Sequence, residues 1–427
     1  MRGVTCAIDT VIQVSKVFFL ISFAMFCPRL FLFYSVRSHN CQRKDTSFKL
    51  GLENINEITK KLFSIGGKEP RIALVTNQAG VDQAGKHVLD ILTDHGLQIS
   101  KVLVPSNGKK AEGQNALHTA PHERKIPIES MCVAFDTLND QLFVDVDMIV
   151  FDLPDISLSY SAYLKVLDEI LLVAAAGHKA VVILDRPNLS GQRMEGALTD
   201  LQRAGDFSVP LRSGMTAGEL STYINKEQLS AKVDLRVVPM CNFKRSHDEQ
   251  KDLLEHLAHA GISTCQLSGY SFLGLLSQVS PFDVGIGTDR AFECLLLPES
   301  AGFGRQKWYE LQVSLRNVGI ESRFYRYFCP ARKEYCSGLR FSMQSIHEHS
   351  TFNTLLSVLM FFKKSGLDLS FSACFDQTVG TPLVREVVQG RKSHELLKEK
   401  VNAGLQTCFN KARESFLYQP LPELVFV

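Results

Sequence analysis

The sequence predicts an α/β fold, in which a Rossmann-like domain with a mainly parallel sheet is followed by a smaller α+β domain. Short apolar runs with the length of buried strands recur from about Arg71 onward. Amphipathic helical stretches separate these runs, and this alternation is typical of right-handed β–α–β units around a parallel sheet. Beyond about Leu275 the alternation stops. We therefore expect a Rossmann-like domain in residues 70–275 and a smaller domain in residues 276–427.

The strands expected in the first domain are apolar runs that end in polar residues. In chain order they are RIALVT (71–76), ISKVLVP (99–105), DMIVFDLPD (147–155), AVVILDRPN (180–188) and DLRVVPM (234–240). The helices between them are GKHVLDILTDHG (85–96), SAYLKVLDEILLVAAAGH (161–178) and a segment near 215–227. Glycines stand where the first two helices are expected to end. TAGE, residues 216–219, is a capping box at the start of the third helix.

The second domain is expected to mix helices with antiparallel strands. The helical segments are RQKWYELQVSLRNVG (305–319) and TFNTLLSVLMFFKKSG (351–366), and the strand segments are SRFYRYF (322–328) and GLRFSMQS (338–345). The carboxyl-terminal part is predicted to be helical and then extended. Together these elements predict an α+β domain.

The amino-terminal residues 1–40 contain an apolar run, VFFLISFAMFCPRLFLFYSV, at residues 17–36. Its uninterrupted part, Val17 to Cys27, has the length of the apolar region of a signal peptide and is short for a membrane span. Arg29 would be costly inside lipid. We expect an exported protein, periplasmic or tethered to a membrane through residues 17–36. The alternative is a cytoplasmic protein whose start site has been assigned too early.

The net charge and the spacing of the cysteines argue against several classes of partner and cofactor. A formal net charge of +2, without a basic run, gives no reason to expect nucleic acid as a partner. The eleven cysteines are widely spaced and none forms Cys-x-x-Cys, so the sequence predicts no metal site. Cys329 and Cys336 could pair as a disulfide, or serve as small buried apolar residues. Gly285–Gly287 is not a dinucleotide fingerprint, and no cofactor is expected.

Polar residues follow the predicted strands of the first domain where each strand ends. Because the carboxyl ends of parallel strands meet at one edge of a sheet, these residues predict a ligand site there. They are Asn77, Ser106, Asn107, Asp152, Asp155, Asp185, Arg186 and Asn188. The alternative is that Asp and Asn at these positions cap helices and shape turns.

Two pairs of charged residues at this edge are open to more than one interpretation. Asp152 and Asp155 could form a pair of carboxyl groups for acid and base catalysis, or one buried structural acid and one helix cap. Arg186 could form an ion pair with its neighbour Asp185 or bind the carboxylate of a ligand.

Several motifs resemble, in order and spacing, those of a glycosidase family. They are LVTNQAGVD (74–82), VFDLPD (150–155), LDRPN (184–188), LRSGMTAGEL (211–220), VVPM (237–240) and FDQTVGT (375–381). Taken together they resemble the exo-β-N-acetylmuramidase family of glycoside hydrolases. The resemblance implies removal of terminal N-acetylmuramic acid from peptidoglycan fragments, as in cell wall recycling. It also implies a Rossmann-like domain followed by a smaller one, with the site at their interface.

The sequence departs from the family pattern at two places. Where the family has Pro-Glu-His-Gly after the second strand, with the glutamate implied as catalytic, this chain has residues 105–108, Pro-Ser-Asn-Gly. The family's Gly-Arg-Gly-Thr is matched by GIGT, so Ile286 stands where the resemblance implies a substrate-binding arginine. Glycosidases normally need two carboxyl groups.

Two functions are consistent with these departures. The first is a divergent hydrolase whose catalytic carboxyl groups come from Asp152, Asp155 and Glu112, the last being the acid nearest to the replaced glutamate. The second is an inactive relative that binds a muramyl glycan or a protein partner in the cleft between the domains.

Overall fold

The computed structural model describes residues 47–63, 69–106, 126–132, 140–154, 157–199, 207–245, 264–330, 332–342 and 349–427. Residues 47–427 form one compact unit. The apolar run at residues 17–36 lies outside the described residues, so export and a membrane tether stay predictions. Within the described ranges, no helix combines the length and the apolar character needed to cross a membrane.

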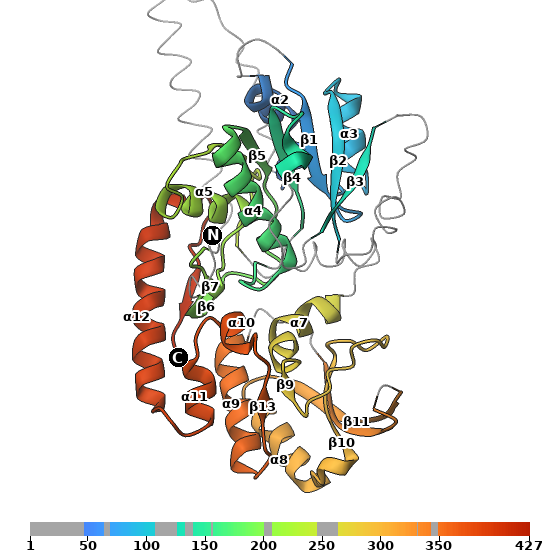
Figure 1. The fold of residues 1–427 in the computed structure, drawn as a ribbon, viewed down its shortest axis with the longest axis vertical. Coiled ribbons are helices and arrows are strands. Elements are labelled where there is room, and N and C mark those ends of the chain that lie inside the picture. The colour runs from blue at the N-terminus through green and yellow to red at the C-terminus, as the bar shows by residue number, and fades with distance from the viewer. Residues whose placement is uncertain are drawn as a thin grey trace, which may run out of the picture. The chain divides into compact units, whose positions relative to one another are not determined.

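A six-stranded parallel sheet forms the amino-terminal half of this unit (Figure 1). Its order is β3 (Ile128–Cys132), β2 (Ile99–Ser106), β1 (Ile72–Thr76), β4 (Met148–Asp152), β5 (Ala180–Leu184) and β8 (Asp234–Val238). Every neighbouring pair runs parallel. The predicted Rossmann-like α/β fold is confirmed, with β3 as an added edge strand.

Both faces of the sheet are covered because its central strands are apolar on both sides. Side chains alternate along a strand, so Ala73 and Val75 join one core whereas Ile72 and Leu74 join another. Helices α4 (Ala162–Gly177) and α5 (Ala217–Glu227) contribute to the first core. Helices α2 (Ile55–Phe63) and α3 (Val88–Asp94) contribute to the second. This burial explains why the strand runs have no polar alternation.

The carboxyl-terminal half contains smaller sheets and helices that the sequence predicted as α+β. One antiparallel sheet has the order β10 (Cys294–Pro298), β12 (Glu334–Ser342) and β11 (Glu321–Cys329). Two short strands, β9 (Val279–Ser280) and β13 (Ser370–Phe371), form an antiparallel pair. The helices are α7 (Thr264–Leu276), α8 (Arg305–Arg316), α9 (Thr351–Lys364), α10 (Phe375–Val379), α11 (Leu383–Val388) and α12 (His394–Ala412).

A third sheet joins segments that are far apart in the sequence. Strand β6 (Arg193–Leu198) pairs antiparallel with β7 (Pro210–Arg212) and parallel with β14 (Glu423–Val425), close to the end of the chain. Gly196, in β6, has a φ of 83°. A Cβ atom there would come within 2.5 Å of the Leu211 Cβ, so this position requires glycine.

A buried ion pair connects this third sheet to helix α9. Arg212 Nη1 donates to Glu195 Oε1 at 2.8 Å and to the carbonyl oxygen of His349 at 3.1 Å. Glu195 also accepts hydrogen bonds from the backbone N–H of Thr351, at 3.0 Å, and from the Ser350 hydroxyl, at the start of α9. A carboxylate at a helix amino terminus is electrostatically favourable. The pair therefore fixes α9 against β6 and β7.

We predict that Arg212→Met lowers the free energy of unfolding by about 3–5 kcal/mol, because it leaves the Glu195 charge buried without its cation. Urea unfolding of the full chain measures this change. The control is Arg71→Met, since the Arg71–Asp147 pair is largely exposed, with side chains 57% and 46% accessible. That control should lose no more than about 1 kcal/mol. Equal losses in the two variants would contradict the role assigned to Arg212.

Candidate ligand site at the carboxyl edge of the parallel sheet

The ends of β1, β4 and β5 bring several of the predicted site residues to one edge. Thr76, the last residue of β1, lies opposite Asp152, the last residue of β4. Asn77 follows directly after β1, and Asp185 directly after β5, which runs parallel to β4. The common edge expected for Asn77, Asp152 and Asp185 is thus present.

Asp152 and Arg186 form a buried bidentate ion pair at this edge. Arg186 Nε donates to Asp152 Oδ1 at 2.6 Å, and Arg186 Nη2 donates to Oδ2 at 2.8 Å. Arg186 Nη1 donates to the carbonyl oxygen of Val81 at 3.0 Å. The two side chains are 0% and 5% accessible. Of the interpretations open for Arg186, the structure shows an ion pair, but with Asp152 and not with its neighbour Asp185.

His87 belongs to the same edge, although no pattern in the sequence predicted it. Its Nε2 lies 3.0 Å from the Asn77 carbonyl oxygen, and its Nδ1 accepts from the Leu89 N–H at 3.2 Å, which caps α3. These contacts require a neutral ring that carries its proton on Nε2. Burial lowers the pKa of His87, which agrees with that form. Histidine is not a usual helix cap, so the pattern around GKHVLD did not single it out.

Asn77 and Gly80 shape the loop between β1 and α3. Asn77 Oδ1 accepts from the Ala79 N–H at 2.9 Å, and its Nδ2 donates to the Tyr163 hydroxyl at 2.9 Å. A Cβ at Gly80 would lie 2.2 Å from Thr76 Oγ1 and 3.1 Å from Asp152 Oδ2. Glycine therefore lets the loop backbone approach the edge closely.

Asp185 is completely buried, and its carboxylate is occupied by groups of the protein. Its Oδ1 accepts from the Gly218 N–H at 2.9 Å, and its Oδ2 accepts from the hydroxyls of Thr216 at 2.8 Å and Tyr418 at 2.6 Å. Burial, opposed in part by these hydrogen bonds, raises the pKa of Asp185 to about 6. The acid thus holds the amino end of α5 and the carboxyl-terminal segment against the sheet.

The side-chain amide of Asn188 carries a hydrogen-bond donor that has no acceptor among the described residues. It is 5% accessible, and its Oδ1 accepts from the N–H and the hydroxyl of Ser190, both at 2.9 Å. Its Nδ2 is buried and has no hydrogen-bond partner among the described residues. A buried donor without a partner is costly, so a ligand atom at this point would be favourable.

Several of the predicted site residues cannot be placed in this arrangement. Asn107, Glu112 and Asp155 lie outside the described residues. The backbone of Ser106 ends β2, opposite Cys132 of β3. Ile286, in the GIGT segment, is 63% accessible. The roles proposed from sequence for these residues stay predictions.

Comparisons with known proteins agree with this architecture. Residues 72–258 match the family described as exo-β-N-acetylmuramidase NamZ, N-terminal. The peptidoglycan β-N-acetylmuramidase NamZ of Bacillus subtilis (strain 168) is 25% identical over 399 residues, which cover 89% of this chain and 93% of that protein. The family resemblance expected from the motifs is confirmed.

Solved structures share the fold. Two DUF1343 family proteins from Bacteroides fragilis NCTC 9343 superpose with TM-scores of 0.69 and 0.63, at 20% and 21% identity. Each comparison covers 87% of this chain and 99% of the other. The architecture of both halves therefore recurs in these proteins.

We predict that Asp185 makes stability depend on pH between about 4 and 6. Its folded pKa of about 6 exceeds its ordinary value of 3.8, so the folded protein binds the proton more tightly than the unfolded chain. The contribution of Asp185 is fully present below about pH 4 and is lost as the pH rises through 6. A shift of about two pKa units corresponds to roughly 3 kcal/mol.

The measurement is urea unfolding of the wild type and of Asp185→Asn from pH 4 to 7. The stability of the wild type relative to the variant should fall by about 3 kcal/mol across this range. Asp147→Asn is the control, since Arg71 holds the pKa of Asp147 at about 2, below the range studied. A wild type and Asp185→Asn that respond equally to pH would show that Asp185 does not titrate in this window.

Proposed function

Because this chain is a divergent relative of the exo-β-N-acetylmuramidase family, we propose that it acts on peptidoglycan fragments that end in N-acetylmuramic acid, as a glycoside hydrolase of that type. The observation that carries the proposal is the convergence of the motif residues on one edge of the sheet. Asn77 belongs to the first motif, Asp152 to the second, and Arg186 and Asn188 to the third. The B. subtilis relative bears the name of a peptidoglycan β-N-acetylmuramidase.

The groups at this edge suit recognition of a sugar. The unused Nδ2 of Asn188 can donate to a hydroxyl or a carbonyl oxygen. The Asp152–Arg186 pair adds a fixed dipole at the same edge, with both side chains buried. Polar groups held in fixed positions by their surroundings bind a ligand at a low cost in conformational entropy.

Hydrolysis needs a proton donor and a second carboxyl group, and Ser106 supplies neither. Both oxygens of Asp152 accept from Arg186, and both oxygens of Asp185 accept from backbone or hydroxyl donors. If either acid gave up these partners, its charge would be left buried and uncompensated. We therefore propose that Asp155 and Glu112 supply the acid and base chemistry in any turnover.

A second function, binding of a glycan without cleavage, is favoured because the carboxylates of Asp152 and Asp185 already accept hydrogen bonds from the protein. If Asp155 and Glu112 do not meet at the edge, the site keeps its capacity to bind a muramyl glycan but has no acid to cleave it. The chain would then be a glycan-binding relative of the hydrolases. Turnover separates the two functions, and binding of the sugar is common to both.

The first test compares turnover and binding in the full chain. We expect release of chromophore from a chromogenic β-N-acetylmuramide, and a loss of about 10²–10⁴-fold in Glu112→Gln or Asp155→Asn, the range for a lost general acid or base. Titration calorimetry with a fragment ending in N-acetylmuramic acid measures binding in parallel. Binding without release by the wild type would select the glycan-binding function. A chain that neither binds nor cleaves would contradict both functions.

The second test restores the family pattern with Ser106→Glu and Asn107→His together. We expect turnover to rise by at least about 10²-fold, since a general acid returns to the end of β2. The matched control is Ser106→Gln with Asn107→His, which has nearly the same volume but no ionisable carboxyl group, and its turnover should stay at the wild-type level. Binding of sugar without any gain in turnover would show that the missing glutamate is not what limits hydrolysis.

A further inference from the structure

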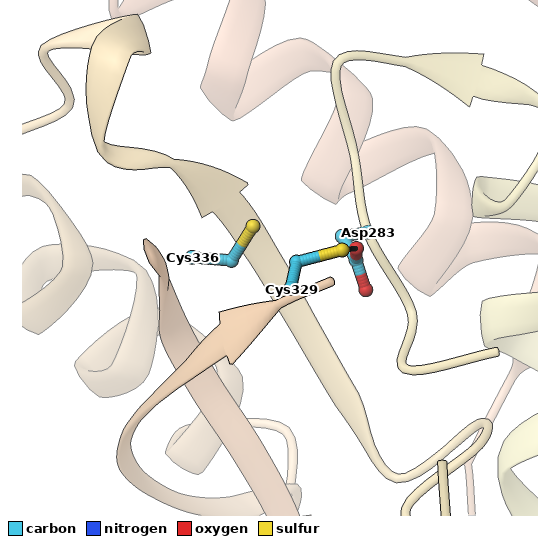
Figure 2. Close-up of side chains that lie close together, drawn as sticks. All are labelled: Asp283, Cys329 and Cys336. Carbon is cyan, nitrogen blue, oxygen red and sulfur yellow. Dashed lines mark hydrogen bonds between the residues drawn. The ribbon is translucent and has the colours of Figure 1, made fainter. Parts of the chain in front are cut away.

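A cluster of metal-binding side chains lies in the carboxyl-terminal half, apart from the sheet-edge site. Asp283, Cys329 and Cys336 each present one ligand atom, and these atoms all lie within 4.8 Å of one another (Figure 2). The two cysteines are buried, and the side chain of Asp283 is 11% accessible. Figure 2 shows the Cys329 sulfur against the Asp283 carboxylate, at 3.5 Å from Oδ2.

Strand register explains why these residues meet. In the β11–β12 hairpin, Tyr327 lies opposite Cys336, and Cys329 lies opposite Glu334. Cys329 and Cys336 are therefore diagonal neighbours on one face, since side chains two residues apart share a face. Asp283 reaches the same face because it pairs with Leu296 of β10, the strand next to β12. Three segments of the chain thus each supply one donor.

The surroundings of Asp283 resemble the outer contacts of a metal ligand. Tyr327 lies with its hydroxyl 3.0 Å from each carboxylate oxygen, and the Gly285 N–H donates to Oδ1 at 2.8 Å. These donors orient the carboxylate, as outer-shell partners do for metal ligands. On its remaining side, Oδ2 faces Cys329, whose thiol is a weak donor. The Cys329 thiol therefore adds little to the stabilisation of this carboxylate.

We propose that Asp283, Cys329 and Cys336 bind a zinc ion. Cysteine sulfur and carboxylate oxygen are both zinc ligands, and thiolates select zinc over calcium or magnesium. On binding, each thiol releases its proton to solvent and its sulfur bonds to the metal. The ligands then carry three negative charges against two on the ion, and Arg332, with Nε 3.7 Å from Asp283 Oδ2, offsets the remainder. Water completes the tetrahedron.

The site would have a structural role. It joins the β11–β12 hairpin to the segment that follows β9, and Gly285, bonded to Asp283, begins the GIGT turn. Within that turn the Thr288 hydroxyl donates to the Gly285 carbonyl oxygen at 2.7 Å. A zinc ion at Asp283 would therefore fix the base of the turn that carries Ile286. The sequence did not predict this site because the cysteines are seven residues apart and the aspartate is distant.

The test measures metal in the full chain, purified under reducing conditions without chelators. We expect about one zinc per chain by plasma mass spectrometry. Asp283→Asn, Cys329→Ser and Cys336→Ser should each lose most of this metal. The matched controls are Cys294→Ser, at a neighbouring buried cysteine on β10, and Cys408→Ser, on α12, and both should keep it.

Cobalt provides a second measurement that does not depend on the variants folding. Cobalt(II) added to the reduced, metal-free wild type should give a thiolate-to-cobalt charge-transfer band that saturates at about one equivalent. The proposal is overturned if the wild type neither retains zinc nor gives this band. It is equally overturned if alkylation and mass spectrometry find Cys329 and Cys336 joined as a disulfide in protein purified without a reducing agent.

Discussion

The buried residue Asp185 is the point on which the arrangement of this molecule depends. Its backbone N–H donates to the Val238 carbonyl at the end of β8, and its backbone carbonyl accepts from the Gly51 N–H. Its carboxylate holds the start of α5 and the hydroxyl of Tyr418, near the end of the chain. A buried carboxylate is tolerated only when its hydrogen bonds are made. The sheet, α5 and the carboxyl-terminal segment therefore have to come together at this residue.

The same requirement distinguishes the residues at the sheet edge that the fold needs from those that could take part in catalysis. Asp152, like Asp185, is fully buried, and its charge is compensated by a cation, Arg186. Removing either partner would leave an uncompensated charge inside the protein, which is strongly destabilising. Burial and these hydrogen bonds thus explain Asp152 and Asp185 by folding alone. Their presence is therefore not by itself an argument for catalysis.

The sequence could predict the strands but not the partners of their charged residues. Continuous apolar runs such as residues 71–76 and 180–184 identify buried parallel strands, and TAGE marks the start of α5, because these signals are local. The pairing of Asp152 with Arg186 depends on residues 34 apart in the chain. Strand β6 contains a glycine with positive φ and was not recognised. His87 was missed because only the folded chain brings it beside Asn77.

Physical constraint also separates the positions that can change easily from those that cannot. The family resemblance implies a catalytic glutamate at the position of Ser106, and a catalytic acid is commonly held at some cost to stability. Ile286, where the resemblance implies a substrate-binding arginine, is largely exposed, so a change at this position leaves no charge unpaired inside the protein. Asp185, Asp152 and Arg186 cannot change so easily, because each one satisfies another buried group. If the chain is a glycan-binding relative, loss of selection on turnover would erode the first two positions and preserve the other three.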